Sequence, residues 1–117
     1  MKPRDVHADA VYLQHILLAA EMIASHLTDV DEAHFMKTPI IQHAVIYQLQ
    51  IMGEAAKRLS MDLRGQHPSV PWQDIAGMRD KLVHDYFGVD LEAVWLAAAV
   101  DVPSVLEYVR DLLAGRP

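Results

Sequence analysis

The chain has 117 residues, enough for one domain and too few for two ordinary ones, and it has no cysteine, which excludes disulfides and thiolate chemistry. Its net charge of −6, from 16 acidic and 10 basic residues, argues mildly against a nucleic-acid binder and leaves room only for a local cationic cleft. No apolar run approaches the roughly 20 residues that span a bilayer, and the N-terminus lacks the apolar core of a signal peptide, so we expect one soluble cytoplasmic domain over residues 1–117 with no membrane partner.

Apolar residues recur at helical spacing throughout the chain, and no segment alternates with period two. A first helix is predicted from about Asp5 to His26, because its apolar residues fall three and four apart on one stripe. The polar segment 28–34 then predicts a connection, with Phe35 as its candidate anchor.

Thr38 and Pro39 are typical of a helix start, since a hydroxyl can cap a helix and proline fits its first turn. The apolar spacing predicts one long helix from there to Gly65. Gly53 lies inside it, where glycine costs up to about 1 kcal/mol relative to alanine. We therefore expect another helix to approach closely at Gly53.

Pro71 is predicted to open a third helix that closes at Gly88. Asp90 is predicted to cap a fourth helix, which Pro103 should kink or split. The pattern as a whole predicts an all-α fold, an antiparallel bundle of four or five helices. Because 52% of the residues are hydrophobic, a homodimer would bury the apolar excess.

The segment "GMRDKLVHDYFG", residues 77–88, concentrates chemistry-bearing side chains within an otherwise plain helical sequence. Asp80 and His84 are four residues apart, so on a helix the carboxylate can hold one ring nitrogen of the imidazole. Arg79 and His84 are separated by about 140° around a helix. They can therefore act on one ligand only in a groove between helices or in a cleft shared by two copies.

Such a set of side chains can cleave RNA without a metal. A histidine, with an ordinary pKa of about 6.5, can take the proton from a ribose 2′-hydroxyl. An arginine can bind phosphate and stabilise the charge that develops in the transition state. DNA lacks the 2′-hydroxyl and would not be cut. The competing interpretation is a solvated helix face with ordinary i, i+4 pairs, and the segment taken alone favours it.

The seven histidines do not predict a metal site, because no two of them are spaced as His-x-His or His-x3-His. Asp80 and His84 form the one ligand-spaced pair worth considering, and no third partner accompanies them in the sequence. We therefore expect no metal and no cofactor.

The stretch "RDKLVHDY" has the form Arg-x4-His-x-Tyr and resembles the signature of the HepT toxins of the HEPN superfamily. The segments "AVIYQLQIMGEAAKRLS" and "HPSVPWQDIAGMRDKLVHDYFGVDLEAVW" resemble that family's second-helix block and the block that carries its site. The likeness runs from about residue 5 to residue 112. It implies a HEPN-like helical bundle, a homodimer, and a ribonuclease toxin paired with a minimal nucleotidyltransferase (MNT) antitoxin.

The resemblance also implies roles for matching positions. Arg79 and His84 would be the ribonuclease pair, and Asp80 would orient or support them. Tyr86 matches the tyrosine that the partner enzyme adenylylates, which would make it an O-AMP-tyrosine. Glu54 is a candidate supporting carboxylate that could pair with Arg79. In the implied homodimer the two motifs face a common cleft, which removes the need for contact along one helix.

Several alternatives stay open at this point. The chain is either a metal-independent endoribonuclease toxin of a type II system, neutralised by modification of Tyr86, or a non-catalytic helical module that binds a nucleotidyltransferase. Tyr86 could instead be a half-buried aromatic side chain at a helix end. For Glu54 we favour a structural polar contact at a helix crossing. A solvated helix face is favoured over phosphate binding for the cationic residues Lys57, Arg58 and Arg64.

Overall fold

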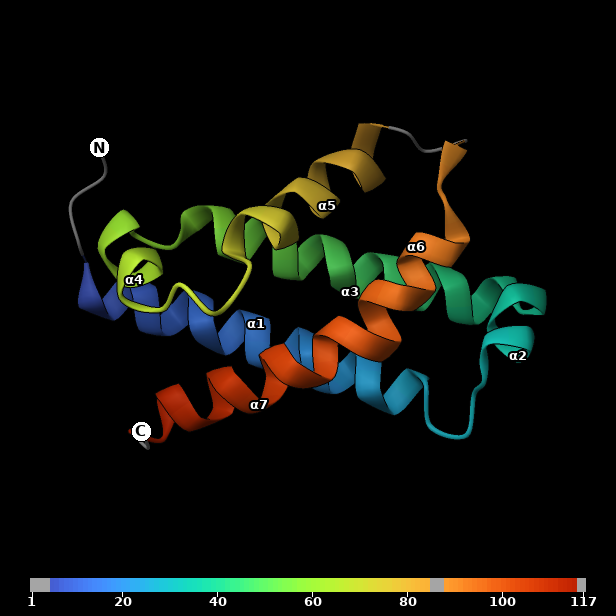
Figure 1. Cartoon of the computed structure of the whole chain (residues 1–117), viewed down its shortest axis with the longest axis horizontal. Coiled ribbons are helices and arrows are strands. Elements are labelled where there is room, and N and C mark those ends of the chain that lie inside the picture. The colour runs from blue at the N-terminus through green and yellow to red at the C-terminus, as the bar shows by residue number, and fades with distance from the viewer. Residues whose placement is uncertain (1–4, 85–87, 116–117) are drawn as a thin grey trace.

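The structure is a computed structural model that describes residues 5–84 and 88–115 (Figure 1). All regular structure in these residues is helical, so the predicted all-α bundle is confirmed. In chain order the elements are α1 (Val6–His26), α2 (Glu32–Lys37), α3 (Pro39–Arg58), α4 (Met61–Gln66), α5 (Trp72–His84), α6 (Leu91–Leu96), the π-helical turn η2 (Ala97–Asp101) and α7 (Val102–Leu113). None of these helices is long and apolar enough to cross a membrane.

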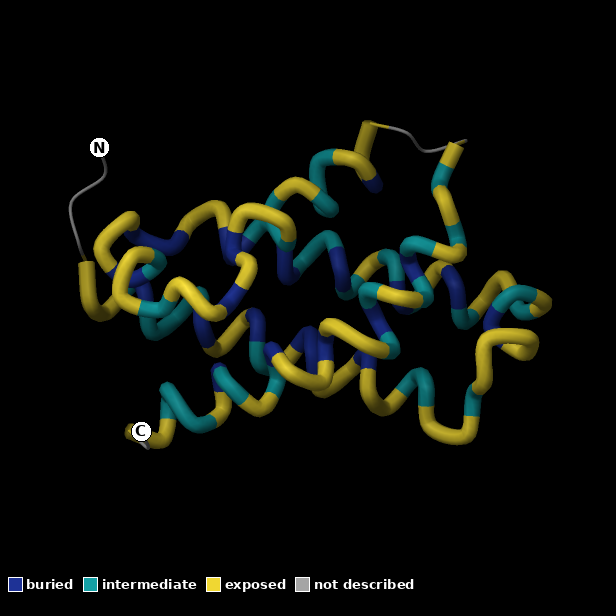
Figure 2. Tube along the Cα trace, in the orientation of Figure 1, coloured by how far each residue is buried: buried dark blue, intermediate teal, exposed yellow. Residues whose placement is uncertain are grey.

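Helix α3 occupies the middle of the bundle, where it packs against α1 on one side and α5 on the other (Figure 1). Consecutive long helices run antiparallel, and α7 returns along α1. The core lies between these helices, and Figure 2 shows its buried positions as short stretches that recur along each helix. Its largest fully buried side chains are Phe35, Ile16, Ile23, Met52, Leu59, Val45, Val94 and Val109. Each contributes on the order of 1.5–3 kcal/mol through apolar burial.

The prediction of one helix from Pro39 to Gly65 is wrong, because the chain leaves the helix at Leu59 and starts α4 after Ser60. The side chain of Ser60 caps α4 by accepting a hydrogen bond from the Leu63 amide at 3.1 Å. The Ser60 amide and hydroxyl donate to the carboxylate of Asp9 at 2.8 and 2.7 Å. A buried acid far away in the sequence therefore fixes this break.

The predicted polar connection after α1 contains a short helix that the sequence pattern did not indicate. Asp31 caps α2 by accepting a hydrogen bond from the His34 amide at 2.8 Å. Phe35 is fully buried, which confirms it as the anchor of this segment.

The predicted helices in the second half of the chain are present. The predicted closure of the third helix at Gly88 depends on residues 85–87, which lie outside the described residues. α5 begins at Trp72, directly after Pro71, and His84 is its last described residue. Asp90 caps α6 as predicted. The helix is interrupted as predicted near Pro103, where the π turn η2 precedes the first turn of α7. Proline has no amide hydrogen to donate to the preceding turn, which favours such a local widening.

Candidate functional site

Helices α3 and α5 cross with almost no space between their backbones at Gly53. A Cβ atom at Gly53 would collide with the Cβ atom of Arg79 and would lie 2.9 Å from the carbonyl oxygen of Ile75. The close approach that the sequence predicted at Gly53 is therefore confirmed. Because the Arg79 backbone is pressed against α3 here, its guanidinium lies beside the next residue of α3, Glu54.

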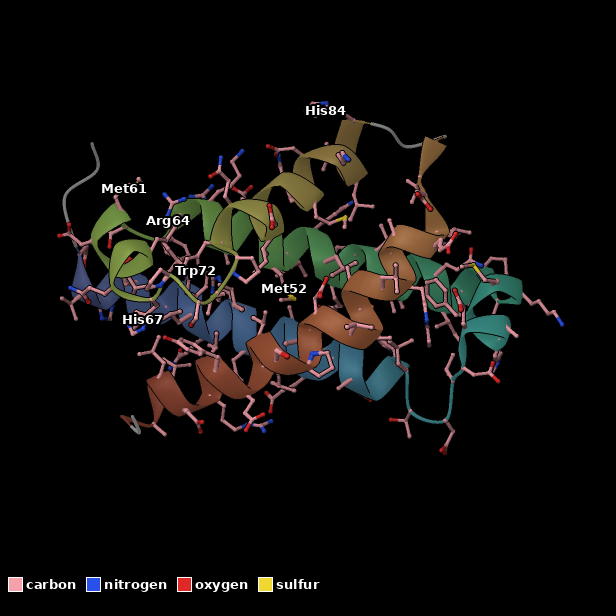
Figure 3. The ribbon with its side chains drawn as sticks, viewed as in Figure 1. Met52, Met61, Arg64, His67, Trp72 and His84 are labelled. Carbon is pink, nitrogen blue, oxygen red and sulfur yellow. The ribbon has the colours of Figure 1, made fainter. Side chains whose placement is uncertain are left out.

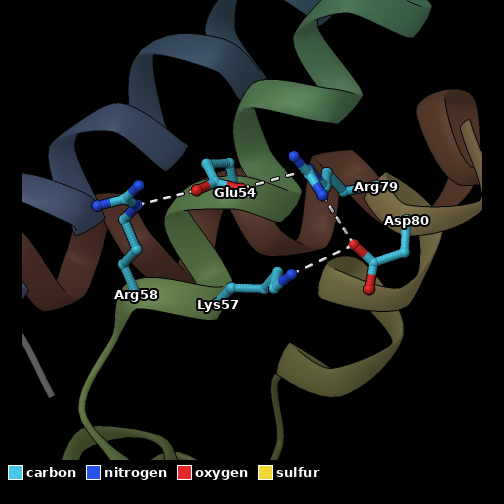
Figure 4. Close-up of polar contacts among 5 residues, drawn as sticks. All are labelled: Glu54, Lys57, Arg58, Arg79 and Asp80. Atoms are coloured by element: carbon cyan, nitrogen blue, oxygen red, sulfur yellow. Dashed lines mark hydrogen bonds and ion pairs between the residues drawn. The ribbon is translucent and has the colours of Figure 1, made fainter. Parts of the chain in front are cut away.

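Five charged side chains form a network at this crossing, which we call the Arg79 clamp (Figure 4). Arg79 Nε forms an ion pair with Glu54 Oε2 at 3.3 Å, and Arg79 Nη1 donates to Asp80 Oδ1 at 3.0 Å. Arg58 Nε donates to Glu54 Oε1 at 2.9 Å, and Lys57 Nζ donates to Asp80 Oδ1 at 3.4 Å. The Arg79 side chain is 28% exposed, so it is held in place and still reaches solvent.

The electrostatics of the clamp keep both carboxylates charged. A hydrogen bond from Arg58 lowers the pKa of Glu54 against the opposing effect of burial, and the charge of Arg79 lowers it further. The pKa of Asp80 is lowered chiefly by its hydrogen bond from Arg79. The clamp contains three cations and two anions, so it carries one excess positive charge in a chain whose net charge is −6.

One nitrogen of the Arg79 guanidinium, Nη2, makes no hydrogen bond in the described part of the chain. Its Nε and Nη1 atoms are engaged with Glu54 and Asp80, whereas Nη2 donates no hydrogen bond to the described residues. A guanidinium that is fixed by two carboxylates and offers a remaining nitrogen is suited to bind a phosphate oxygen without first reorganising.

His84 lies at the outer end of α5 (Figure 3). Its ring is exposed and forms no hydrogen bond within the described part of the chain. The predicted hydrogen bond from the His84 ring to the Asp80 carboxylate is therefore absent, because Asp80 turns its carboxylate toward the cations of Arg79 and Lys57. A single chain thus does not bring Arg79 and His84 together. Tyr86 lies outside the described residues.

Lys57 and Arg58 lie on an exposed helix face, as expected from the sequence. The sequence did not indicate that they pair there with Asp80 and Glu54. The spacing of Glu54 and Arg58, four residues apart on one helix, was the available signal. Glu54 does pair with Arg79 at the helix crossing. Arg64, the third cation considered, instead contacts the sulfur of Met61 at 3.1 Å.

Over residues 5–84 and 88–115, no group of three or more histidine, aspartate and glutamate side chains lies close enough together to hold a metal ion.

Comparison with known proteins identifies the family. A family model described as "Ribonuclease HepT-like" matches residues 16–112. "Probable ribonuclease HepT" of Thermococcus cleftensis is 40% identical over 94 residues, which cover 80% of this chain and 86% of that protein. "Putative RNase MJ0125" of Methanocaldococcus jannaschii is 39% identical over 113 residues, covering 97% and 95%. "Putative RNase TTE0752" of Caldanaerobacter subterraneus is 38% identical over 102 residues, covering 87% and 91%.

No solved structure matches this chain significantly. The family model covers most of the sequence, and the three relatives are each at least 38% identical to this chain over at least 86% of their own length. The chain belongs to the ribonuclease HepT-like family.

Proposed function

We propose that this protein is a metal-independent endoribonuclease toxin of a HepT/MNT-like toxin–antitoxin system. The observation that carries the proposal is the Arg79 clamp, which fixes a guanidinium five residues before His84 and leaves one of its nitrogens free for a phosphate. The family membership and the names of the relatives support ribonuclease activity.

The proposed reaction is a transfer within the RNA strand. His84 takes the proton of a ribose 2′-hydroxyl, and the oxygen attacks the neighbouring phosphorus as the bond from phosphorus to the 5′-oxygen breaks. The 5′-oxygen takes a proton from solvent water as it leaves, and His84 returns its own proton to the solvent, so the products are a 2′,3′-cyclic phosphate and a 5′-hydroxyl. Arg79 binds the phosphate oxygens on which negative charge increases.

Two copies of the chain form the complete site in this proposal. The Arg79 guanidinium and the His84 ring are not in contact within one chain, and they leave α5 in directions about 140° apart. A homodimer that places two copies of α5 around a common cleft would present Arg79 of one protomer beside the His84 ring of its partner. Pairing two clamps would also concentrate positive charge in an otherwise acidic molecule.

Regulation by adenylylation of Tyr86 completes the proposal. A nucleotidyltransferase antitoxin would transfer AMP to the phenol oxygen of Tyr86, which follows His84 by two residues. The added phosphate is anionic and would compete with the RNA phosphate for the guanidinium of Arg79. The adenosine would in addition block the cleft sterically.

Purified protein incubated with single-stranded RNA in the presence of EDTA tests the catalytic proposal. We expect cleavage with cyclic-phosphate ends, and a loss of at least about 100-fold in His84→Ala and in Arg79→Ala. His34→Ala on α2 and Arg110→Ala on α7 are matched controls that should cleave normally. Cleavage unaffected by His84→Ala and Arg79→Ala would contradict the assignment. No cleavage at all would favour the non-catalytic module that only binds a nucleotidyltransferase.

Intact mass after co-expression with a neighbouring nucleotidyltransferase gene tests the regulatory proposal. We expect one added AMP per chain on Tyr86 and none in Tyr86→Phe, whereas Tyr108→Phe is the control that keeps the modification. Silencing of Tyr86→Phe by the partner without any attached nucleotide would overturn this part of the proposal.

A further inference from the structure

An open groove of about 480 Å³ lies between α1, α3 and α5, and Arg79 forms part of its wall. Tyr12 and His15 line it from α1, with their rings edge to face and 5.9 Å between centroids. Tyr47 and Arg58 line it from α3. The groove therefore combines aromatic rings with two guanidinium groups of the clamp.

Tyr47 stands where this groove meets a second one. The second groove, of about 510 Å³, follows α3 toward α6 and shares Tyr47 and Gln50 with the first. Tyr47 is 61% exposed and, among the described residues, forms neither a hydrogen bond nor a ring contact. The other large aromatic rings that the fold needs, such as Phe35 and Trp72, are buried. The Tyr47 ring thus contributes little to the described fold.

These features fit one ligand chemistry. An unpaired base can stack on an exposed aromatic ring, and the phosphate beside that base can bind a guanidinium in the same groove. The apolar lining from Ile51, Ala55 and Val83 suits the faces of a base and a ribose. A base within a duplex is already stacked on its neighbours and cannot use the ring.

We propose that Tyr47 is a stacking platform for an unpaired RNA base beside the Arg79 clamp. The inference rests on the proposed ribonuclease function, and it gives the enzyme a preference for single-stranded RNA. Arg58 and Arg79 are the cations that line the groove. With about two phosphate contacts, the logarithm of the binding constant should fall with that of the salt concentration at a slope of only about −1.4.

Binding of an RNA that this route cannot cleave tests the site apart from catalysis. We would measure fluorescence anisotropy of a labelled single-stranded oligomer with methylated 2′-hydroxyls. Tyr47→Ala should weaken binding about tenfold, whereas Tyr47→Phe retains the ring and should bind as the unaltered protein does. Ile40→Ala, an exposed position on the same helix outside both grooves, is the matched control.

A fluorescent base analogue distinguishes stacking from general loss of affinity. 2-Aminopurine in the oligomer should be quenched on binding to the unaltered protein and to Tyr47→Phe, but not to Tyr47→Ala at saturating concentration. Equal affinity and equal quenching in Tyr47→Ala would overturn the proposal.

Two further measurements distinguish the stacking proposal from dimerisation through this face and from the proposed ribonuclease function. If sedimentation shows that Tyr47→Ala turns a dimer into monomers, the face binds a second copy and the stacking proposal is wrong. Cleavage of unmodified RNA is scored independently. If Tyr47→Ala weakens binding but the unaltered protein does not cleave RNA, the stacking proposal is supported and the proposed ribonuclease function is refuted. If the protein cleaves RNA and Tyr47→Ala leaves cleavage unchanged, the ribonuclease function is supported and the stacking proposal is refuted.

Discussion

Two of the polar contacts that join helices in the described part of the chain differ in what they leave open to a ligand. Asp9 is 3% exposed, and both of its carboxylate oxygens accept hydrogen bonds from Ser60 at the junction of α3 and α4. The Arg79 clamp is partly exposed, carries an excess positive charge and keeps one guanidinium nitrogen free among the described contacts. A contact that is fully satisfied and buried serves the fold, whereas an incomplete one at the surface is available to a ligand.

The two contacts should also differ in how much they contribute to the stability of the fold. Partly exposed ion pairs contribute little to stability, because water screens them and ordering the side chains costs entropy. Hydrogen bonds from buried groups to a carboxylate contribute more to stability. If one partner is removed, the other stays buried with neither a protein partner nor water to satisfy it. We therefore expect changes in the clamp to affect activity and changes at Asp9 to affect folding.

The largest expected effect is on catalysis, in Arg79→Lys. Lysine keeps the charge but cannot hold two carboxylates and a phosphate with one planar fork. RNA cleavage should fall about 100-fold, whereas the free energy of unfolding, measured by urea titration, should change by less than about 1 kcal/mol. Arg110→Lys, in a surface ion pair with Glu21, is the control and should change neither. A large loss of stability in Arg79→Lys would contradict the assignment of the Arg79 clamp to activity and of the Asp9–Ser60 contact to folding.

Asp9→Ala should show the opposite pattern. The buried amide and hydroxyl of Ser60 lose their acceptor, so the free energy of unfolding should fall by about 2–3 kcal/mol. The cleavage rate per folded molecule should stay unchanged. Asp62→Ala removes an exposed carboxylate from the neighbouring helix and should alter stability by less than about 0.5 kcal/mol.

Gly53→Ala tests whether the clamp depends on the close helix crossing. The new methyl group would meet Arg79 and the Ile75 carbonyl, so α5 must move away from α3. We expect a loss of about 1–3 kcal/mol in unfolding free energy together with reduced cleavage. Gly77→Ala on α5 has open space around its Cβ position and should be neutral or stabilising by up to about 1 kcal/mol. Equal behaviour of the two variants would contradict the role of the crossing.

The smallest effect is the pH dependence of the clamp, followed in Glu54→Gln. Because the folded state lowers the pKa of Glu54, its contribution to stability is fully present above the ordinary value of 4.5 and is lost as the pH falls through the lowered value. The stability difference between the unaltered protein and Glu54→Gln should therefore be constant near neutrality and vanish in acid. Urea titrations at several pH values measure this stability difference. A difference that grows in acid would refute the linkage between Glu54 ionisation and stability.

The sequence predicted those features that depend on neighbours along the chain. The helical periodicity, the Asp90 cap and the close approach at Gly53 were predicted from local patterns. The break at Ser60 was not, because the apolar spacing continues through it and the deciding partner, Asp9, belongs to another helix. Within the site, the pairing of Glu54 with Arg79 was anticipated, whereas the preference of Asp80 for cations over His84 depends on how α3 and α5 cross.

The π turn η2 fixes the relative rotation of the helices that it joins. Such a turn holds one residue more than regular helix, so the residues beyond it are turned by about 100°. Before it, α6 places Trp95 against Phe35, with ring centroids 5.4 Å apart. After it, α7 places its buried valines toward α1. A single-residue deletion between Ala97 and Asp101 would rotate either Trp95 of α6 or the buried valines of α7 away from the core. We therefore expect the number of residues in this turn to matter more for the fold than their identity.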